Sequence, residues 1–192
     1  NGTDYWIVIV DNNTDNFFVY ELDENGLSNP MPRQRDSDLL PSQPIKISPD
    51  GTRLSEAGVL YNFNTNNGNI TNPRNLTNSA YGLAFSPSSQ YLYIADQQGA
   101  DVVVKRYETT SNNVASTEEE LFFLEDVLSG QMQIAPDGKI YWVVRPLNSP
   151  EISYLHTIDC PNSSNPTLVE EVFTLPNGLY ATGGLPNFTD HL

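Results

Sequence analysis

The chain has little of several things that would otherwise fix its class. It contains a single cysteine, Cys160, so no disulfide can form within the chain, and we expect this residue to be a small, half-buried thiol. No apolar run approaches the roughly 18 residues of a membrane span, and no signal peptide is recognisable. Amphipathic helical periodicity is also lacking. The sequence therefore predicts neither a disulfide scaffold nor a protein inserted in a membrane.

Basic residues are scarce as well. Nine Lys and Arg stand against 24 Asp and Glu, which gives a formal net charge of −15 at pH 7. Nucleic-acid binding depends on neutralising phosphates with Lys and Arg, so this charge argues against nucleic acid as a partner, and equally against anionic membrane surfaces. An acidic surface favours solubility and leaves cation binding open.

Turn residues and aromatic residues, in contrast, are abundant. Fourteen Pro, 12 Gly and 21 Asn are typical of a chain that spends much of its length in turns. Ten Tyr, eight Phe and two Trp supply large apolar areas suited to packing one sheet against another. At 192 residues, the chain is long enough for one compact domain with a substantial core.

A strand-turn-strand motif occurs three times. In each copy an apolar run ends in a Ser-Pro or Ala-Pro turn, and a second strand-like run follows at once. The turn prolines are Pro49, Pro87 and Pro136, with spacings of 38 and 49 residues. A blade of a β-propeller, made of four strands, needs roughly 40 to 50 residues. In the middle copy Ser88 and Ser89 stand where the other copies have Asp-Gly, so we expect a looser turn there.

Each copy continues with a third strand, a polar hairpin and a fourth strand. The third strands are expected near residues 59–63, 102–107 and 152–158, and the later fourth strands near 120–124 and 168–175. Asn67-Gly68 is a strong hairpin signal in the first copy. An earlier unit has strand-like runs at residues 5–10 and 17–22. In the second unit only residues 52–58 separate the turn from the next expected strand, so we expect either that this blade is truncated or that part of the natural chain is missing there.

These patterns predict an all-β fold, a β-propeller of about four blade-like units that form an incomplete ring. We predict a single domain over residues 1–192, with approximate blades at 1–44, 45–80, 81–129 and 130–192. Four blades alone would leave a tight ring or an open arc with exposed edges. We expect the open arc, completed by further chain.

The candidate metal ligands are Asp11, Asn13 and Asp15. Their side-chain oxygens occur at alternate positions, the spacing by which a tight loop wraps Ca²⁺. However, Asn16 occupies the glycine position of an EF-hand, and Leu22 stands where the bidentate Glu is needed. Asx-turn chemistry in a hairpin is the competing interpretation. Calcium at this loop is the one cofactor hypothesis, and no other cofactor is expected.

No catalytic residue stands out. We expect His156, within a predicted strand, to be packed or solvent-exposed rather than catalytic, and His191 lies in the final tail. There is neither a Gly-x-Ser-x-Gly elbow nor a Cys/His pair in a suitable context. The acidic run at residues 118–120 is expected to be a solvated strand entrance.

Several segments together resemble the β-propeller regions of large secreted proteins of Bacteroidetes. The segments are NGTDYWIV at residues 1–8, NFFVYEL at 16–22, NGLSNP at 25–30, YGLAFSP at 81–87, GQMQIAPDGKIY at 130–141 and GLPNF at 184–188. The family comprises gliding-motility-associated and PKD-repeat proteins with a C-terminal sorting domain for type IX secretion. The resemblance covers nearly the whole chain. It implies the C-terminal half to two-thirds of a propeller with WD40- or YVTN-like repeats, secreted or at the cell surface.

Two classes of function stay open. The first is a non-catalytic binding or scaffold module of a larger secreted protein, which presents loops to a protein or glycan ligand in adhesion and contacts the remainder of the propeller or another chain. The alternative is a propeller hydrolase or lactonase-like enzyme whose active residues lie in missing blades. The lack of clustered His, Asp and Glu on the predicted inner strands favours a binding module that is not an enzyme.

Overall fold

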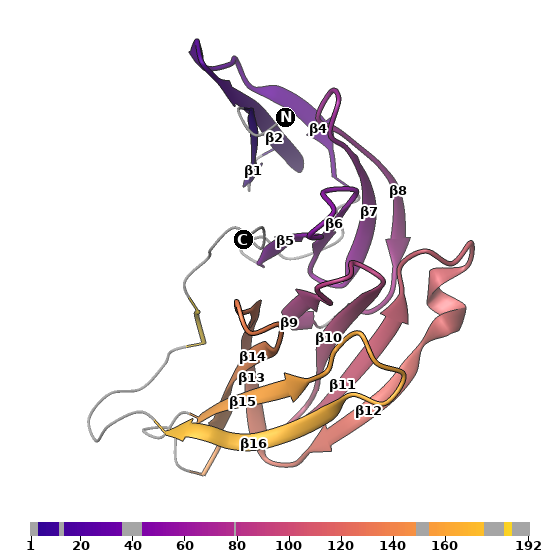
Figure 1. The fold of residues 1–192 in the computed structure, drawn as a ribbon, viewed down its shortest axis with the longest axis vertical. Helices are drawn as coiled ribbons and strands as arrows, with labels where there is room; N and C mark the ends of the chain where they lie inside the picture. Colours follow the sequence, from indigo (N-terminus) through magenta and orange to yellow (C-terminus); the bar gives the residue numbers. More distant parts are fainter. Residues whose placement is uncertain are drawn as a thin grey trace.

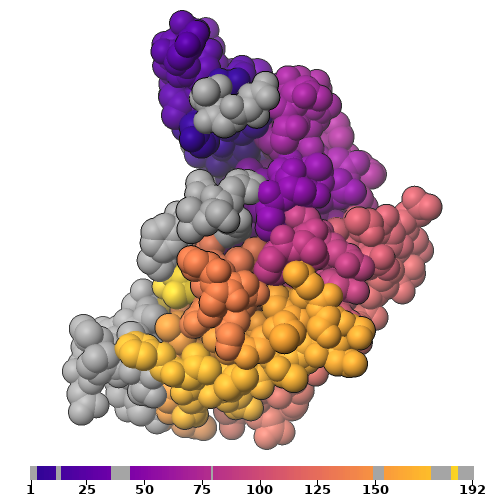
Figure 2. All heavy atoms as spheres, viewed as in Figure 1, coloured from indigo at the N-terminus to yellow at the C-terminus, as the bar shows by residue number. Residues whose placement is uncertain are grey.

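The four repeated units fold as four small antiparallel sheets arranged along an open arc (Figure 1). The structure is a computed structural model that describes residues 4–11, 14–35, 44–78, 80–148, 154–174 and 183–185. The sheets follow one another in chain order, and Figure 2 shows the first sheet, in indigo, at the end of the arc opposite the fourth, in orange. This arrangement confirms the predicted all-β partial propeller.

The second, third and fourth sheets each have four strands whose spatial order is their order in the chain. The second sheet consists of β5 (Ile45–Ile47), β6 (Arg53–Glu56), β7 (Val59–Asn64) and β8 (Asn69–Asn75). The third consists of β9 (Ala80–Phe85), β10 (Tyr91–Gln98), β11 (Asp101–Glu108) and β12 (Glu119–Leu124), with the short 3₁₀ turn η1 (Val114–Thr117) before β12. The fourth consists of β13 (Val127–Ile134), β14 (Ile140–Pro146), β15 (Tyr154–Asp159) and β16 (Thr167–Thr174). Strand β9 packs against both β5 and β13, so the first strand of each sheet lies innermost.

The first sheet is built differently. It contains β1 (Tyr5–Asp11), β2 (Asn16–Asp23), β3 (Gly26–Leu27) and β4 (Met31–Gln34), and both β3 and β4 pair with β2. Strand β4 packs against β8, the outermost strand of the second sheet. Strand β1 is therefore the edge on the inner side, and the described residues supply no strand beyond it.

The prediction that the second blade is truncated is wrong. The seven residues after its proline turn contain the four-residue strand β6 and a two-residue turn at Ala57 and Gly58. Both turn residues have positive φ, +50° and +89°, as the tightest hairpin turns require. The sequence pattern missed β6 because a four-residue strand leaves almost no periodic signal.

The turn at Ser88 and Ser89 is not looser than its counterparts. The Ser89 amide donates to the Ser86 carbonyl at 2.8 Å, and the equivalent bond from Gly51 to Ser48 is also 2.8 Å. Ser89 takes a φ of +64°, close to the +71° of Gly51. Its hydroxyl accepts a hydrogen bond from the Asp50 amide of the neighbouring sheet at 2.9 Å. This bond between sheets helps to hold a non-glycine residue in the left-handed region.

The hydrophobic core is divided into three clusters, one at each junction between neighbouring sheets. Large buried members are Phe17, Val59 and Tyr61 between the first and second sheets, Leu60, Phe85 and Tyr107 between the second and third, and Tyr93, Met132 and Trp142 between the third and fourth. Stacking sheets face to face in this way is the packing of a propeller. In the described part of the chain no helix is long and apolar enough to cross a lipid bilayer.

Candidate functional site: a pocket between the third and fourth sheets

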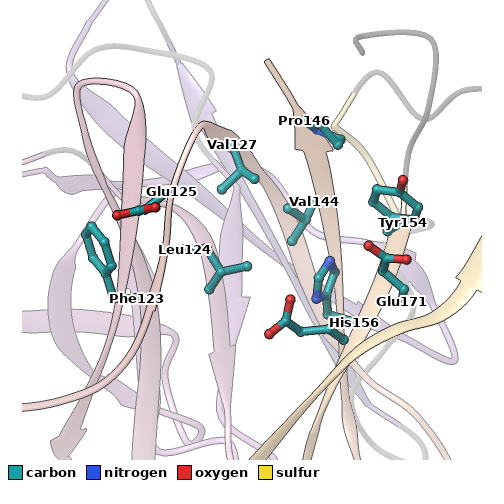
Figure 3. A pocket seen from close by; sticks show the side chains of 10 residues that line it. Phe123, Leu124, Glu125, Val127, Val144, Pro146, Tyr154, His156 and Glu171 are labelled. Carbon is teal, nitrogen blue, oxygen red and sulfur yellow. The ribbon is translucent and has the colours of Figure 1, made fainter. Parts of the chain in front are cut away.

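A pocket of about 320 Å³ opens between the third and fourth sheets (Figure 3). It is bounded by the end of β12 and the start of β13 on one side and by β14, β15 and β16 on the other. Its lining residues are Phe123, Leu124, Glu125, Val127, Val144, Pro146, Tyr154, His156, Glu170 and Glu171. The volume lies within the range of about 300 to 1,000 Å³ that is usual for small-ligand sites.

His156 is the buried polar group of this pocket. Its side chain points to the same face of the fourth sheet as Trp142 and Tyr154, with ring centroids 5.8 and 6.3 Å from theirs, and the residue is only 3% exposed. Neither ring nitrogen has a hydrogen-bond partner within the described residues. Burial lowers the pKa of His156 to about 4. The imidazole is therefore neutral near pH 7, with one nitrogen that donates and one that accepts.

A β-bulge directs two carboxylates into the pocket. Three residues of β16 lie opposite the single residue His156, because the register between β15 and β16 shifts at this point. Glu171, the middle residue of the bulge, has a φ of +52°. Consecutive residues of a regular strand point to opposite faces, whereas here Glu170 and Glu171 both line the pocket.

Both acidic and apolar side chains line the pocket. Glu125, Glu170 and Glu171 are exposed, and no described cation pairs with any of them. Val127 and Val144 contribute to the apolar wall. Among the residues that the structure describes, no group of three His, Cys, Asp or Glu side chains is placed to hold a metal ion. The arrangement suits an organic ligand that is cationic at one end and apolar along its length.

The hairpin between β15 and β16 is fastened to the third sheet. The Tyr93 hydroxyl donates to the Pro161 carbonyl at 2.8 Å, and Arg106 donates to the Ser163 carbonyl at 2.7 Å. Burial raises the pKa of Tyr93 to about 12, so this donor keeps its proton. Cys160, expected to be half-buried, is instead exposed at the start of this hairpin with a φ of +52°. These bonds hold the two walls of the pocket together.

The acidic run at residues 118–120 is exposed at the entrance to β12, as predicted, and two of its carboxylates also form ion pairs. One carboxylate oxygen of Glu118 lies 3.2 Å from the Lys105 ammonium, and Glu119 pairs with Arg106. Two of the three carboxylates therefore stabilise the pairing of β12 with β11. The sequence pattern did not predict these ion pairs, because the Lys and Arg residues on β11 face the run across the sheet, which only the strand register reveals.

The structure describes part of the candidate calcium loop. Asp11 ends β1 and accepts a hydrogen bond from the Thr14 hydroxyl, and Asp15 has a φ of +51° with its carbonyl accepting the Arg35 amide at 3.1 Å. Asn13 lies outside the described residues. Calcium binding by Asp11, Asn13 and Asp15 stays a prediction. A melting temperature that does not change with Ca²⁺ or EDTA would contradict it.

The inner strands, which line the axis of the arc, carry different side chains from those of the pocket. Strands β5, β9 and β13 contain no His, Asp or Glu. Lys46 of β5 donates to the side-chain oxygen of Gln133 on β13, and both residues are buried. This hydrogen bond joins the second and fourth sheets across the inner end of the third.

Sequence reasoning placed one residue of the pocket correctly and missed the acidic ones. His156 is packed within a strand, as predicted, while His191 lies outside the described residues. The pocket glutamates were not recognised as candidates. Two consecutive glutamates, Glu170 and Glu171, interrupt an otherwise apolar run on β16, and this interruption was the available signal of a bulge.

Comparison with known proteins supports the fold. No protein-family model matches the chain, and no curated protein sequence matches it. Among solved structures, the periplasmic gluconolactonase of Pseudomonas aeruginosa has a TM-score of 0.58 at 14% identity, over 91% of this chain and 54% of its own. A predicted TolB of Agrobacterium tumefaciens has a TM-score of 0.57 at 17% identity, over 91% and 62%. A predicted 6-phosphogluconolactonase of Bacteroides fragilis has a TM-score of 0.56 at 16% identity, over 90% and 52%.

These similarities place the chain in the β-propeller class. At 14 to 17% identity they establish the fold and nothing finer. The chain spans between 52 and 62% of the length of these three propellers.

Proposed function

We propose that the chain is a non-catalytic binding and scaffold part of a larger β-propeller. The observation that carries this proposal is the outward face of the first sheet. Tyr5, Ile7 and Ile9 alternate along β1 and are 58, 39 and 46% exposed, and the large apolar side chains of Leu22 and Leu27 extend the same face. Contiguous apolar faces of this kind mark interaction sites.

The opposite face of β1 packs against a neighbouring sheet. Trp6, Val8 and Val10 alternate with the exposed residues and pack into the cluster between the first and second sheets. The exposed face therefore has the composition of a face that stacks against another sheet. Because the inner edge of β1 is also without a strand partner in the described chain, we propose that the remainder of the propeller supplies both a strand and a neighbouring sheet.

The proposed setting is extracellular or at the cell surface, within an adhesion or gliding-motility protein exported by type IX secretion. Three observations support it: the acidic surface, the resemblance to secreted Bacteroidetes propellers, and the similarity to a propeller described as periplasmic. In that setting the loops and the pocket would meet a protein or glycan ligand.

Hydrogen exchange tests the proposed position in a larger propeller. We expect the β1 amides to exchange slowly in the longer natural protein and quickly in the 192-residue chain alone. The amides of β10, buried in the third sheet, provide the internal reference. The double variant Ile7→Asp/Ile9→Asp should lower the stability of the short chain by about 1 kcal/mol per substitution, the span of strand propensity, and that of the longer protein by several times more. Equal, fast exchange of β1 in both proteins would contradict the proposal.

A lactone hydrolase is the second candidate. The neutral imidazole of His156 beside Glu170 and Glu171 is a group that could accept a proton during hydrolysis. Two of the similar propellers are described as lactonases. Ring opening of glucono-1,5-lactone, followed by acid release, decides between the two candidates. A binding module leaves the reaction at its spontaneous rate. A faster rate that falls to the spontaneous one in His156→Ala would favour the enzyme.

A further inference from the structure

We propose that the pocket between the third and fourth sheets binds the ammonium or guanidinium end of a lysine or arginine side chain that a partner protein presents. This inference rests on the proposed binding role and names the chemistry of its ligand. It is carried by three independent features of the pocket: unpaired carboxylates, a buried imidazole without a partner, and an apolar wall.

The first feature is the charge at the mouth. Glu125 comes from the turn after β12, and Glu170 and Glu171 come from the bulge of β16, so the carboxylates approach from both sheets. None of the three has an ion-pair partner in the described part of the chain. A cation entering between them can form charge-assisted hydrogen bonds without breaking existing ones.

The second feature is His156, which lines the same pocket as these carboxylates. Figure 3 shows its ring on the same side of the pocket as Val144 and Tyr154. A buried nitrogen without a hydrogen bond is unfavourable, so a ligand N–H that reaches the accepting nitrogen removes an existing penalty. Since the imidazole is neutral near pH 7, it does not repel a cation. A hydrogen-bond donor of positive charge therefore suits this position.

The third feature is the size and lining of the cavity. Leu124, Val127 and Val144 line it beside Pro146, which provides apolar contact for a chain of methylene groups. A space of about 320 Å³ is far larger than a bare metal ion needs, and no described group of side chains is placed to coordinate one. A flexible aliphatic stem with a cationic end matches these dimensions and the net charge of −15.

The test uses the tripeptide acetyl-Gly-Lys-Gly-amide as the probe, with its norleucine analogue as the uncharged control. We expect saturable binding of the lysine peptide by NMR titration, with shifts confined to the strands that line the pocket, β12 to β16, and no binding of the norleucine peptide. The ¹⁵N resonances of the His156 ring should move on saturation, because its accepting nitrogen gains a hydrogen bond. A purely structural role for His156 would leave these resonances in place.

Matched charge variants sharpen the test. Glu170→Gln/Glu171→Gln should weaken binding by about tenfold for each charge-assisted hydrogen bond that is lost. Glu24→Gln/Glu120→Gln removes the same charge from two exposed positions outside the pocket and should leave the affinity within about twofold. Circular dichroism and melting curves confirm that both double variants fold.

Several results would overturn the inference. These are binding of neither peptide, equal binding of both, equal weakening by the two double variants, or saturation of the same glutamates by Ca²⁺ alone without peptide binding. Failure here is separable from failure of the proposed propeller position, because that test reads β1 in the first sheet. Slow exchange of β1 with no peptide binding would reject only the lysine or arginine ligand.

Discussion

Two junctions between neighbouring sheets differ in the side chains that fill them. They are the junction between the first and second sheets and the junction between the third and fourth. In the former, two T-shaped aromatic pairs meet: Trp6 with Phe63 at 6.2 Å and Phe17 with Tyr61 at 5.3 Å. In the latter, the corresponding space contains the Trp142–His156 contact, the bulge of β16 and a pocket. Junctions between stacked sheets can therefore be filled by side chains or left with a pocket.

The difference follows from the side chains that face each gap. Tyr61 also lies at a shift in register, between β7 and β8, but there the rings of Phe17 and Tyr61 meet and fill the gap. Around His156 the shift in register adds residues to β16 and turns two glutamates toward the gap instead of apolar side chains. A shift in register occurs beside both junctions, and the side chains that it places in the gap decide which junction is filled.

The largest expected effect is the loss of an aromatic ring from the filled junction. Phe17→Ala should lower the free energy of unfolding by about 3 to 5 kcal/mol, because the fully buried ring leaves a cavity among rigid neighbours. Urea unfolding measures this value. The control is Phe173→Ala on β16, where the ring is 51% exposed and the expected loss is below about 1 kcal/mol. Equal losses would show that the burial of Phe17 in the filled junction adds nothing to stability.

The second effect is a dependence of stability on pH that originates in the junction between the third and fourth sheets, which contains the pocket. The pKa of His156 is about 4 in the folded protein and 6.5 for an unperturbed histidine of the unfolded chain, so the unfolded state binds more protons between these values. Stability is therefore full above pH 6.5 and falls as the pH drops toward 4, by up to about 3 kcal/mol.

The variant His156→Leu isolates this contribution. The neighbouring titratable groups, Glu125, Glu170, Glu171 and Tyr154, are present in both proteins. The variant should lose the additional acid sensitivity and, at pH 7, be as stable as the original or about 1 kcal/mol more stable, because a buried group without a partner is removed. Parallel pH profiles would show that the imidazole is solvated.

A smaller effect is expected for the bond that fastens the pocket hairpin. Tyr93→Phe removes the buried hydroxyl that donates to Pro161 and should cost about 1 to 2 kcal/mol in thermal or urea unfolding. Tyr141→Phe removes the more exposed bond to Asp137 and should cost less than about 0.5 kcal/mol. A larger loss from Tyr141→Phe than from Tyr93→Phe would show that the bond from Tyr93 to Pro161 is not the stronger of the two.

The smallest effect is expected at the intermediate junction, between the second and third sheets. Ser89→Gly removes the strain of a non-glycine residue in the left-handed region, which costs about 1 kcal/mol. It also removes the hydrogen bond from the Asp50 amide to the Ser89 hydroxyl, which contributes about as much. The net change should lie within about 0.5 kcal/mol. Ser89→Ala keeps the strain and loses the bond, so it should unfold at lower urea concentration than either. If Ser89→Ala were as stable as the original, the bond between the sheets would contribute nothing.

Much of the fold was predictable because the repeats combine proline turns with alternating apolar residues. Pro49, Pro87 and Pro136 located three blades, since a proline at a turn constrains the backbone whatever surrounds it. The site was not predictable in the same way. His156 was expected to be packed or solvent-exposed, and its neighbours Glu170 and Glu171 meet it only through a bulge that depends on pairing between strands. Local patterns do not encode such register shifts.

The lone thiol gives the hairpin a practical use. Cys160 is exposed, has no second cysteine to compete with it, and begins a segment whose carbonyls are bonded to the third sheet. A maleimide fluorophore attached to Cys160 would be held at the end of β15, the strand that carries His156. Its fluorescence would report binding in the neighbouring pocket in real time, with no further substitution in the chain.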